Sequence, residues 1–410
     1  RVKLVGNLVI PVQREVLWSV YGPAIRNGEA VYAVRYAGMG TIGIWEQLYR
    51  MNKAANFTEW QNAMRLGQLP MFNTVYADRE GNIYYLYNGL LPVRAEGYDW
   101  DAYLPGNTSE TLWTEYWDFD SLPQVLNPPA GFVQNANATP FQATLGLGNP
   151  DPSAYPAYLR IDPNQSNRSL RLLELLGADE SITPEEFVAY KFDMCYSTQS
   201  DVARFQQILA GAQMPPLAEL TRAQDVIRTW NLCTDPENTG AALMVYTLAY
   251  LKQNYPDSLD VSEMAGTANV SEAMLVESFT LAVQTLNTHF GRVDVRWSDA
   301  NRLVRGNVNL GLGGGPDILH AVYGNIDSET GRRIGSSGDS YVMLVTWDKN
   351  GNVSAQSIHQ FGSATLDAAS PHYADQSPLF VARQLKPAWF DEADIRANLK
   401  SEYVPGQENR

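Results

Sequence analysis

The sequence predicts an α+β protein, because strand patterns occupy both ends of the chain and helix patterns occupy the middle. Apolar stretches joined by turn residues fill the first hundred residues and return after residue 300. Helix start and stop signals dominate between them. We therefore predict one interdependent unit whose two ends build the same sheet. It comprises a β-rich core part at 1–180, a helical insertion at 181–291 and C-terminal strands at 292–410.

Three hairpins are predicted from turn residues that lie between apolar stretches. The Asn-Gly pair at 27–28 is the residue pair of a tight two-residue turn. Residues 73–78 and 82–88 form the second predicted pair of strands. The third consists of 341–347 and 353–358, which flank an Asp-Lys-Asn-Gly turn.

Two helices are predicted between the first two hairpins, at 43–54 and 58–66, with Thr58 as the N-cap of the second. Residues 95–165 follow the second hairpin and are rich in Pro, Asn, Asp and aromatic residues. Because this segment has no sustained hydrophobic periodicity of a helix or a strand, we predict that it forms long, ordered loops.

The central part of the chain carries the strongest helix signals. Thr183 is a predicted N-cap, Pro184 follows at the first helical position, and Glu186 completes a capping box. A second amphipathic helix is predicted at 271–290, ended by Gly291.

Composition limits the class of partner. With 45% hydrophobic and 18% charged residues, the 410-residue chain is typical of a globular protein. Its 30 basic and 45 acidic residues give a net charge of −15, which argues against nucleic acid and anionic membranes as partners. No apolar run is long enough to span a bilayer. Cys195 and Cys233 are expected as buried free thiols, and a disulfide is the alternative if the protein is exported.

No cofactor or metal site is predicted. No two of the four histidines have a zinc-ligand spacing, and two of them, His320 and His359, are expected to be structural. The glycine-rich run at 311–315 matches neither a dinucleotide fingerprint nor a P-loop. Carboxylates among Trp100, Trp113 and Trp117 leave a saccharide-binding loop open as an alternative.

Several motifs in the same order carry a family resemblance. Residues 21–23 read YGP, 73–94 read NTVYADREGNIYYLYNGLLPVR, and 127–140 read NPPAGFVQNANATP. Residues 338–344 and 357–376 read GDSYVML and SIHQFGSATLDAASPHYADQ. These stretches resemble the β chain of the penicillin acylase family of N-terminal nucleophile (Ntn) hydrolases, in particular its acyl-homoserine lactone acylase branch. The resemblance implies part of an αββα four-layer Ntn-hydrolase sandwich with a helical insertion.

The resemblance also implies a mechanism. A serine at the start of the β chain attacks an amide carbonyl, with its own α-amino group as the base. Asn137 matches the asparagine whose side-chain amide donates to the oxyanion, and Asn135 is expected to support the loop. Arg168 is the candidate for the arginine that organises this site, ahead of Arg160 and Arg171.

The start of the chain departs from the family pattern. Arg1 has no hydroxyl or thiol, and Tyr21 stands where the turn usually has a histidine. Residues 1–12 are expected to lie within a strand. We therefore expect the nucleophile on a missing upstream segment, with the α chain and the N-terminal part of the β chain as partners. Alone, this chain is expected to be inactive, and its exposed sheet edge could support a dimer.

Further expectations follow from the resemblance. It implies a periplasmic or secreted protein, and the family's structural calcium would take most of its ligands from the missing segment. Residues 370–376 hold Ser, His and Asp, but neighbours so close are not expected to converge, and we predict a structural loop near the substrate mouth. The expected substrates are N-acyl homoserine lactones or related acylated amines. The alternatives are a penicillin or cephalosporin (β-lactam) acylase, or a non-catalytic saccharide-binding or scaffold fragment.

Overall fold

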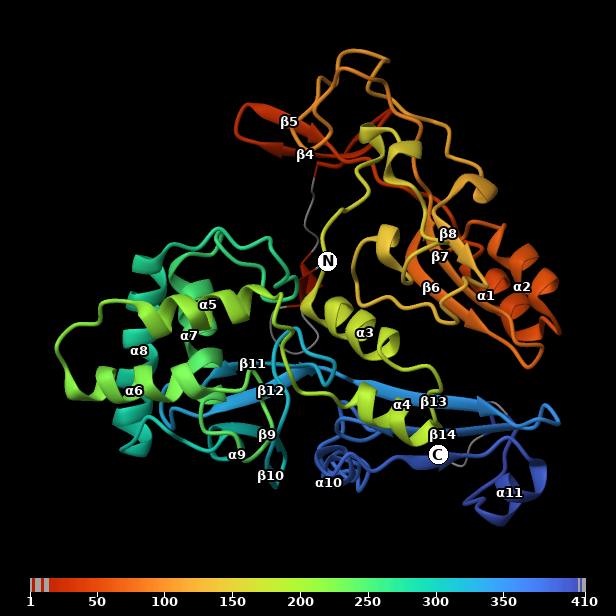
Figure 1. The fold of residues 1–410 in the computed structure, drawn as a ribbon. Coiled ribbons are helices and arrows are strands. Elements are labelled where there is room, and N and C mark those ends of the chain that lie inside the picture. The colour runs from red at the N-terminus through yellow and green to blue at the C-terminus, as the bar shows by residue number, and fades with distance from the viewer. Residues whose placement is uncertain (1, 4–8, 11–14, 405, 408–410) are drawn as a thin grey trace.

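We describe residues 2–3, 9–10, 15–404 and 406–407 in a computed structural model of the chain. Figure 1 shows the N-terminal strands in red and orange on one side, the helical block in green on another, and the C-terminal strands in blue below both. Helix α3 lies between these parts. At the start of the chain, β1 (Val2–Lys3) pairs antiparallel with β2 (Val9–Ile10). Arg1 lies outside the described residues.

The N-terminal part contains two antiparallel three-stranded sheets and two helices. Their bounds are β3 (Leu17–Ser19), β4 (Gly22–Asn27), β5 (Ala30–Ala33), α1 (Ile44–Lys53), α2 (Phe57–Met64), β6 (Met71–Ala77), β7 (Ile83–Gly89) and β8 (Gln124–Leu126). The first two predicted hairpins are confirmed, as β4–β5 and β6–β7. Gly28 has a φ of 63°, the left-handed conformation that this turn requires and that glycine adopts without strain.

The predicted cap of the second helix is wrong by two residues. Asn56, not Thr58, is the N-cap of α2, and its side chain accepts a hydrogen bond from the backbone N–H of Glu59 at 2.9 Å. The Glu59 carboxylate in turn accepts from the backbone N–H of Ala55 at 2.9 Å. The two acceptors satisfy amides at the helix start, which leaves Thr58 inside the first turn.

The long segment at 95–165 contains the short strand β8, which the sequence did not predict, and four 3₁₀ turns. The turns are Phe119–Ser121, Pro140–Gln142, Pro152–Ala154 and Ala157–Leu159. The rest of this segment forms loops, as predicted.

The middle of the chain contains α3 (Asn167–Gly177), α4 (Pro184–Lys191), α5 (Asp201–Gly211), α6 (Ala218–Thr229), α7 (Ala241–Asn254), α8 (Glu272–Phe290) and α9 (Trp297–Ala300), of which α5 to α8 form the helical block. The predicted capping box of α4 is confirmed, with Thr183 and Glu186 bonding each other's backbone N–H groups. Helix α8 has Ser271 as N-cap and ends at Gly291, whose φ is 68°. Among the described residues, no helix has the length and apolar character needed to cross a membrane.

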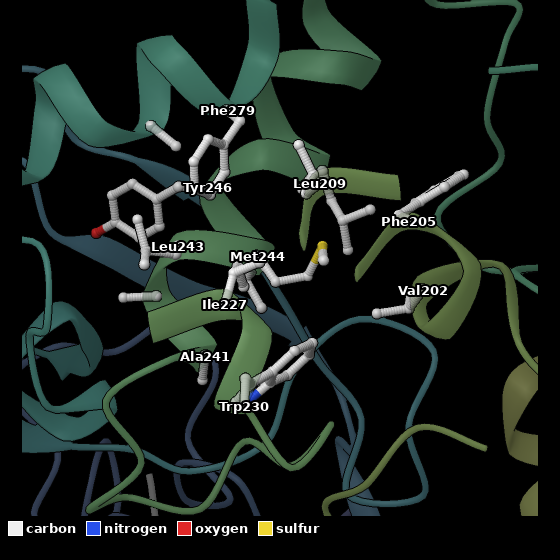
Figure 2. Close-up of a cluster of buried hydrophobic side chains, with 14 of the residues drawn as sticks. Val202, Phe205, Leu209, Ile227, Trp230, Ala241, Leu243, Met244, Tyr246 and Phe279 are labelled. Atoms are coloured by element: carbon white, nitrogen blue, oxygen red, sulfur yellow. The ribbon is translucent and has the colours of Figure 1, made fainter. Parts of the chain in front are cut away.

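The largest hydrophobic core lies among these helices (Figure 2). Leu243, Met244 and Tyr246 of α7 are fully buried, and they pack with Leu209 of α5 and Phe279 of α8. Because α7 is surrounded on nearly all sides, its sequence is apolar around the whole helix rather than along one stripe. This core holds the helices of the block together.

The C-terminal part contains one four-stranded sheet, ordered β10-β9-β12-β11, and one three-stranded sheet, ordered β13-β14-β15. The bounds are β9 (Asn301–Arg305), β10 (Val308–Gly311), β11 (Val322–Ile326), β12 (Arg333–Gly338), β13 (Tyr341–Trp347), β14 (Val353–His359), α10 (Ser377–Val381), β15 (Lys386–Ala388) and α11 (Glu392–Ala397). The third predicted hairpin is confirmed as β13–β14. The prediction that both ends of the chain build one sheet is wrong for the described strands, which pair only within their own part.

Cys195 and Cys233 form a disulfide, so the expectation of two free thiols is wrong. The two residues face each other in an isolated antiparallel bridge, flanked by a 2.9 Å backbone hydrogen bond from Tyr196 to Leu232. The segments before α5 and after α6 therefore meet side by side. Sequence spacing alone does not reveal this approach, because 38 residues separate the cysteines.

Candidate active site

The loop that carries Asn137 is shaped by its neighbour Asn135. The Asn135 side chain accepts from the Asn137 backbone N–H at 3.0 Å and donates to the Ala138 carbonyl at 3.0 Å. Asn137 itself has a φ of 57°, a left-handed conformation that asparagine tolerates better than most residues. These contacts give Asn135 the supporting position expected of it and leave the Asn137 side chain exposed.

Arg168 contacts Asn137 directly. It lies in the first turn of α3, where its Nη1 donates to Asn137 Oδ1 at 3.1 Å and its Nε donates to Asp317 Oδ1 at 3.1 Å. The guanidinium is therefore held from both sides. Because Arg168 occupies the amide oxygen of Asn137, the amide nitrogen Nδ2 faces away from this bond. Within the described residues, Nδ2 has no protein acceptor, so its N–H groups are available to a ligand.

Asp317 anchors this arrangement from the interior. Its side chain is fully buried and also accepts from the backbone N–H groups of Asn167 and Met264, both at 2.8 Å. Burial raises the pKa of Asp317 to about 6, while the Arg168 charge and these N–H donors oppose the shift. Asp317 thus joins α3, the segment after α7 and the loop before β11. Sequence reasoning missed it, because it is 149 residues from Arg168.

Asn137 lies on the wall of two cavities and is the one lining residue that they share. The larger has a volume of about 1300 Å³, and its lining includes the aromatic residues Phe72, Tyr87, Trp100 and Trp113. The smaller has a volume of about 400 Å³ and is lined by Asn137, Arg168, Ser262, Glu263, Ala321, Tyr323, Gly338 and Asp339. An acceptor atom bound by Asn137 therefore has a mostly apolar space and a polar space beside it.

The two other candidate arginines have different partners. Arg160 forms an ion pair with Asp101 and lies on the wall of the larger cavity. Arg171 binds Asp193 at 2.8 Å and Glu174 at 2.9 Å. Neither hydrogen-bonds Asn137, so the structure brings only Arg168 of the three to this side chain.

Tyr21 is buried, and its hydroxyl contacts the Thr108 carbonyl and, at 2.9 Å, the Thr111 hydroxyl. It lines the larger cavity. Gly22, which follows it, has a φ of 137°, and a Cβ there would lie 2.5 Å from the Val34 carbonyl oxygen. This close approach explains the glycine in the turn.

The loop at 370–376 does not form a catalytic triad. His372 Nδ1 and Asp375 Oδ2 lie 2.8 Å apart, so the expectation that these neighbours cannot converge is wrong for this pair. The Ser370 hydroxyl, however, accepts from the His372 backbone N–H rather than contacting the ring. None of residues 370–376 lines either cavity. Arg305 stacks over the Tyr373 ring at 3.8 Å, which favours a structural role.

The other sequence candidates lie in packed surroundings. His320 is buried, and its Nδ1 lies 3.2 Å from Asp339 Oδ2. His359 packs against the ring of Tyr341. Trp113 is buried beneath the Arg35 guanidinium, and Trp117 packs against Tyr155. Of the two, Trp113 lines the larger cavity, whereas Trp117 lines neither cavity.

No metal-binding donor set is evident in the part of the chain that the structure describes. The one converging group of three consists of Cys195, Cys233 and Asp235. Its two sulfur atoms are bonded to each other and cannot serve as thiolate ligands.

Comparisons of sequence and fold show which known proteins the chain is similar to. The chain is 25% identical to an acyl-homoserine lactone acylase PvdQ of Pseudomonas fluorescens over 460 residues, 97% of this chain and 56% of that protein. It is 38% identical to penicillin G acylase of Escherichia coli over 89 residues, 22% of this chain and 10% of that protein. The thermostable penicillin G acylase of Alcaligenes faecalis has a similar fold, with a TM-score of 0.61 and 17% identity, over 95% of this chain and 78% of that one.

The chain thus spans about half the length of the curated relatives that it matches. In fold, the chain is similar to the Alcaligenes enzyme and combines helices and sheets. The family model for penicillin amidase matches residues 2–397. Because that match covers nearly the whole sequence, this chain belongs to the penicillin amidase family.

Proposed function

We propose that this chain supplies the oxyanion-binding half of an acylase that hydrolyses the amide of N-acyl homoserine lactones or related acylated amines. The observation that carries the proposal is the orientation of Asn137. Arg168 occupies its amide oxygen, and its amide nitrogen remains free between an aromatic cavity and a polar one. A neutral amide donor held in this way stabilises negative charge without itself titrating.

In this proposal a serine supplies the attacking oxygen from a part of the protein outside this chain. The serine hydroxyl loses its proton to the α-amino group and forms a bond to the amide carbon. The carbonyl oxygen becomes an oxyanion, which accepts a hydrogen bond from Asn137 Nδ2. The C–N bond then breaks, and the amine leaves with the proton. Water hydrolyses the resulting ester and regenerates the serine.

The partners and location belong to the same proposal. The α chain and the N-terminal part of the β chain would complete the enzyme, and the protein would be periplasmic or secreted. The disulfide supports export, because disulfides persist in oxidising compartments. A β-lactam acylase remains the alternative, since the same oxyanion chemistry serves both substrates.

The test is amide hydrolysis by the protein in its full natural length. Asn137→Ala and Asn137→Gly should each lower kcat by about 10²–10³ because the donor is lost. Glycine adopts the left-handed backbone at this position without strain, so an equal loss in both variants assigns the effect to the amide. Asn350→Ala, at an exposed hairpin turn, is the matched control and should keep full activity. A protein that cleaves no acyl amide, or Asn137 variants with unchanged kcat, would refute the proposal.

A further inference from the structure

The smaller cavity has a charge pattern that points to a particular class of ligand. An amide carbonyl bound at Asn137 has two substituents, the acyl carbon and the amide nitrogen. The two cavities share only Asn137, so each can receive one substituent. The aromatic lining of the larger cavity suits an apolar acyl group, because burial of apolar surface is favourable there. The smaller cavity then remains for the amine.

Most charges around the smaller cavity are already paired. Asp317 compensates Arg168 at 3.1 Å. Asp339 binds Lys191 Nζ at 2.7 Å and contacts His320. These pairs leave little net charge for a ligand to compensate.

Glu263 differs from these residues. No cationic side chain of the described residues lies within ion-pair distance of its carboxylate, which accepts only from Asn164 Nδ2 at 3.3 Å. Burial raises the pKa of Glu263, and the nearby carboxylates of Asp162 and Asp260 raise it further, while the Asn164 hydrogen bond and the Arg168 charge oppose the shift. The wall of the smaller cavity therefore carries one carboxylate that has no ion-pair partner among the described residues.

We propose that the smaller cavity is the amine subsite and that Glu263 restricts it to amines without a carboxylate. This inference rests on the proposed acylase function. A neutral amine such as a homoserine lactone, or a cationic one, meets no repulsion there. An amine that bears a carboxylate, such as an amino acid or a β-lactam nucleus, faces like charge at Glu263. Exclusion by an unpaired charge is a common device for specificity.

The test compares two substrates with one acyl chain, an N-acyl homoserine lactone and the ring-opened N-acyl homoserine, on the protein in its full natural length. They differ in the lactone, which opens to a carboxylate. The wild-type protein should prefer the lactone, and Glu263→Gln should reduce the lactone-to-acid ratio of kcat/KM by about tenfold, chiefly through faster reaction of the acid. Glu80→Gln removes the same charge at an exposed turn and should leave the ratio unchanged.

The outcomes separate the two proposals. If the protein hydrolyses acyl amides but Glu263→Gln leaves the ratio as it was, the assignment of Glu263 is overturned and the acylase function stands. If no acyl amide is hydrolysed, the acylase function fails, and the amine subsite fails with it. Calorimetric titration with free homoserine lactone and free homoserine provides a second measurement that needs no turnover. Equal affinities of the wild-type protein for the two amines would overturn the inference.

Discussion

At the scale of single residues, Asp317 links the stability of the protein to pH. Its pKa in the folded protein, about 6, is above the ordinary value of 3.8, so the folded state binds the proton more tightly than the unfolded state. Its contribution to stability is therefore fully present below pH 4 and is lost as pH rises through 6. The loss is about 3 kcal/mol by the conversion of pKa shift into free energy.

Asp317→Asn tests this linkage. Asparagine resembles the protonated carboxyl at every pH, so the variant should match the wild type most closely at pH 4.5. Between pH 4.5 and 7.5, the wild-type protein should lose more unfolding free energy than the variant, as measured by urea denaturation. Identical pH dependence in the two proteins would show that Asp317 keeps an ordinary pKa.

The sequence predicted part of the residue-level site. A local motif located Asn137 and Asn135, and the structure brings Arg168, rather than Arg160 or Arg171, to Asn137. Asp317 had no such signal, because its role arises only when α3 and the loop before β11 meet. Catalytic roles for Asn137 and Arg168 stay proposals.

At the scale of elements, the start of α3 positions Arg168. Ser166 is its N-cap and is fully buried, and its hydroxyl both accepts from the Ser169 N–H and donates to the Ala136 carbonyl, each at 3.1 Å. Ser166→Ala removes both bonds and should cost about 1–2 kcal/mol of stability. Because the lost bonds tie α3 to the Asn137 loop, kcat should fall as well.

The cap of α8 offers a matched control for this prediction. Ser271 is exposed and caps its helix through the Met274 N–H at 3.3 Å. Ser271→Ala should lower the melting temperature without changing kcat. If the Ser166 variant also keeps its full kcat per molecule of folded protein, the first turn of α3 does not position the site.

Local signals explain which elements the sequence predicted. The capping box at Thr183 and the hairpin turn at Gly28 are complete within a few residues, and both appear as predicted. Thr58 failed as a cap because Asn56 offers a competing cap two residues earlier. Strand β8 is only three residues long, too short for a recognisable alternation.

At the scale of the whole molecule, long-range contacts were the least predictable. In the described residues, the strands at the two ends of the chain form separate sheets. Their hydrophobic patterns were also compatible with one common sheet. Pairing between distant strands depends on tertiary packing, which local periodicity does not encode. The disulfide was predicted only as an alternative for the same reason, because its two cysteines meet only through the packing of distant segments.

The disulfide closes a 38-residue separation around α5 and α6, two helices of the main core. By loop-closure entropy it should stabilise the fold by about 4 kcal/mol. The double variant Cys195→Ser/Cys233→Ser should have an unfolding free energy lower by about 4 kcal/mol. Its stability should no longer depend on reductant. An unchanged melting temperature in dithiothreitol, with reduction confirmed by mass, would contradict this.

In the proposed function, Arg168 acts by orienting Asn137. A double-mutant cycle on kcat tests it most directly, with Asn137→Gly, Arg168→Gln and the combined variant in the full-length protein. We predict that the combined variant is no slower than Asn137→Gly alone, because Arg168 has nothing left to orient. Losses that multiply in the combined variant would show that the two side chains act independently and would contradict the claim.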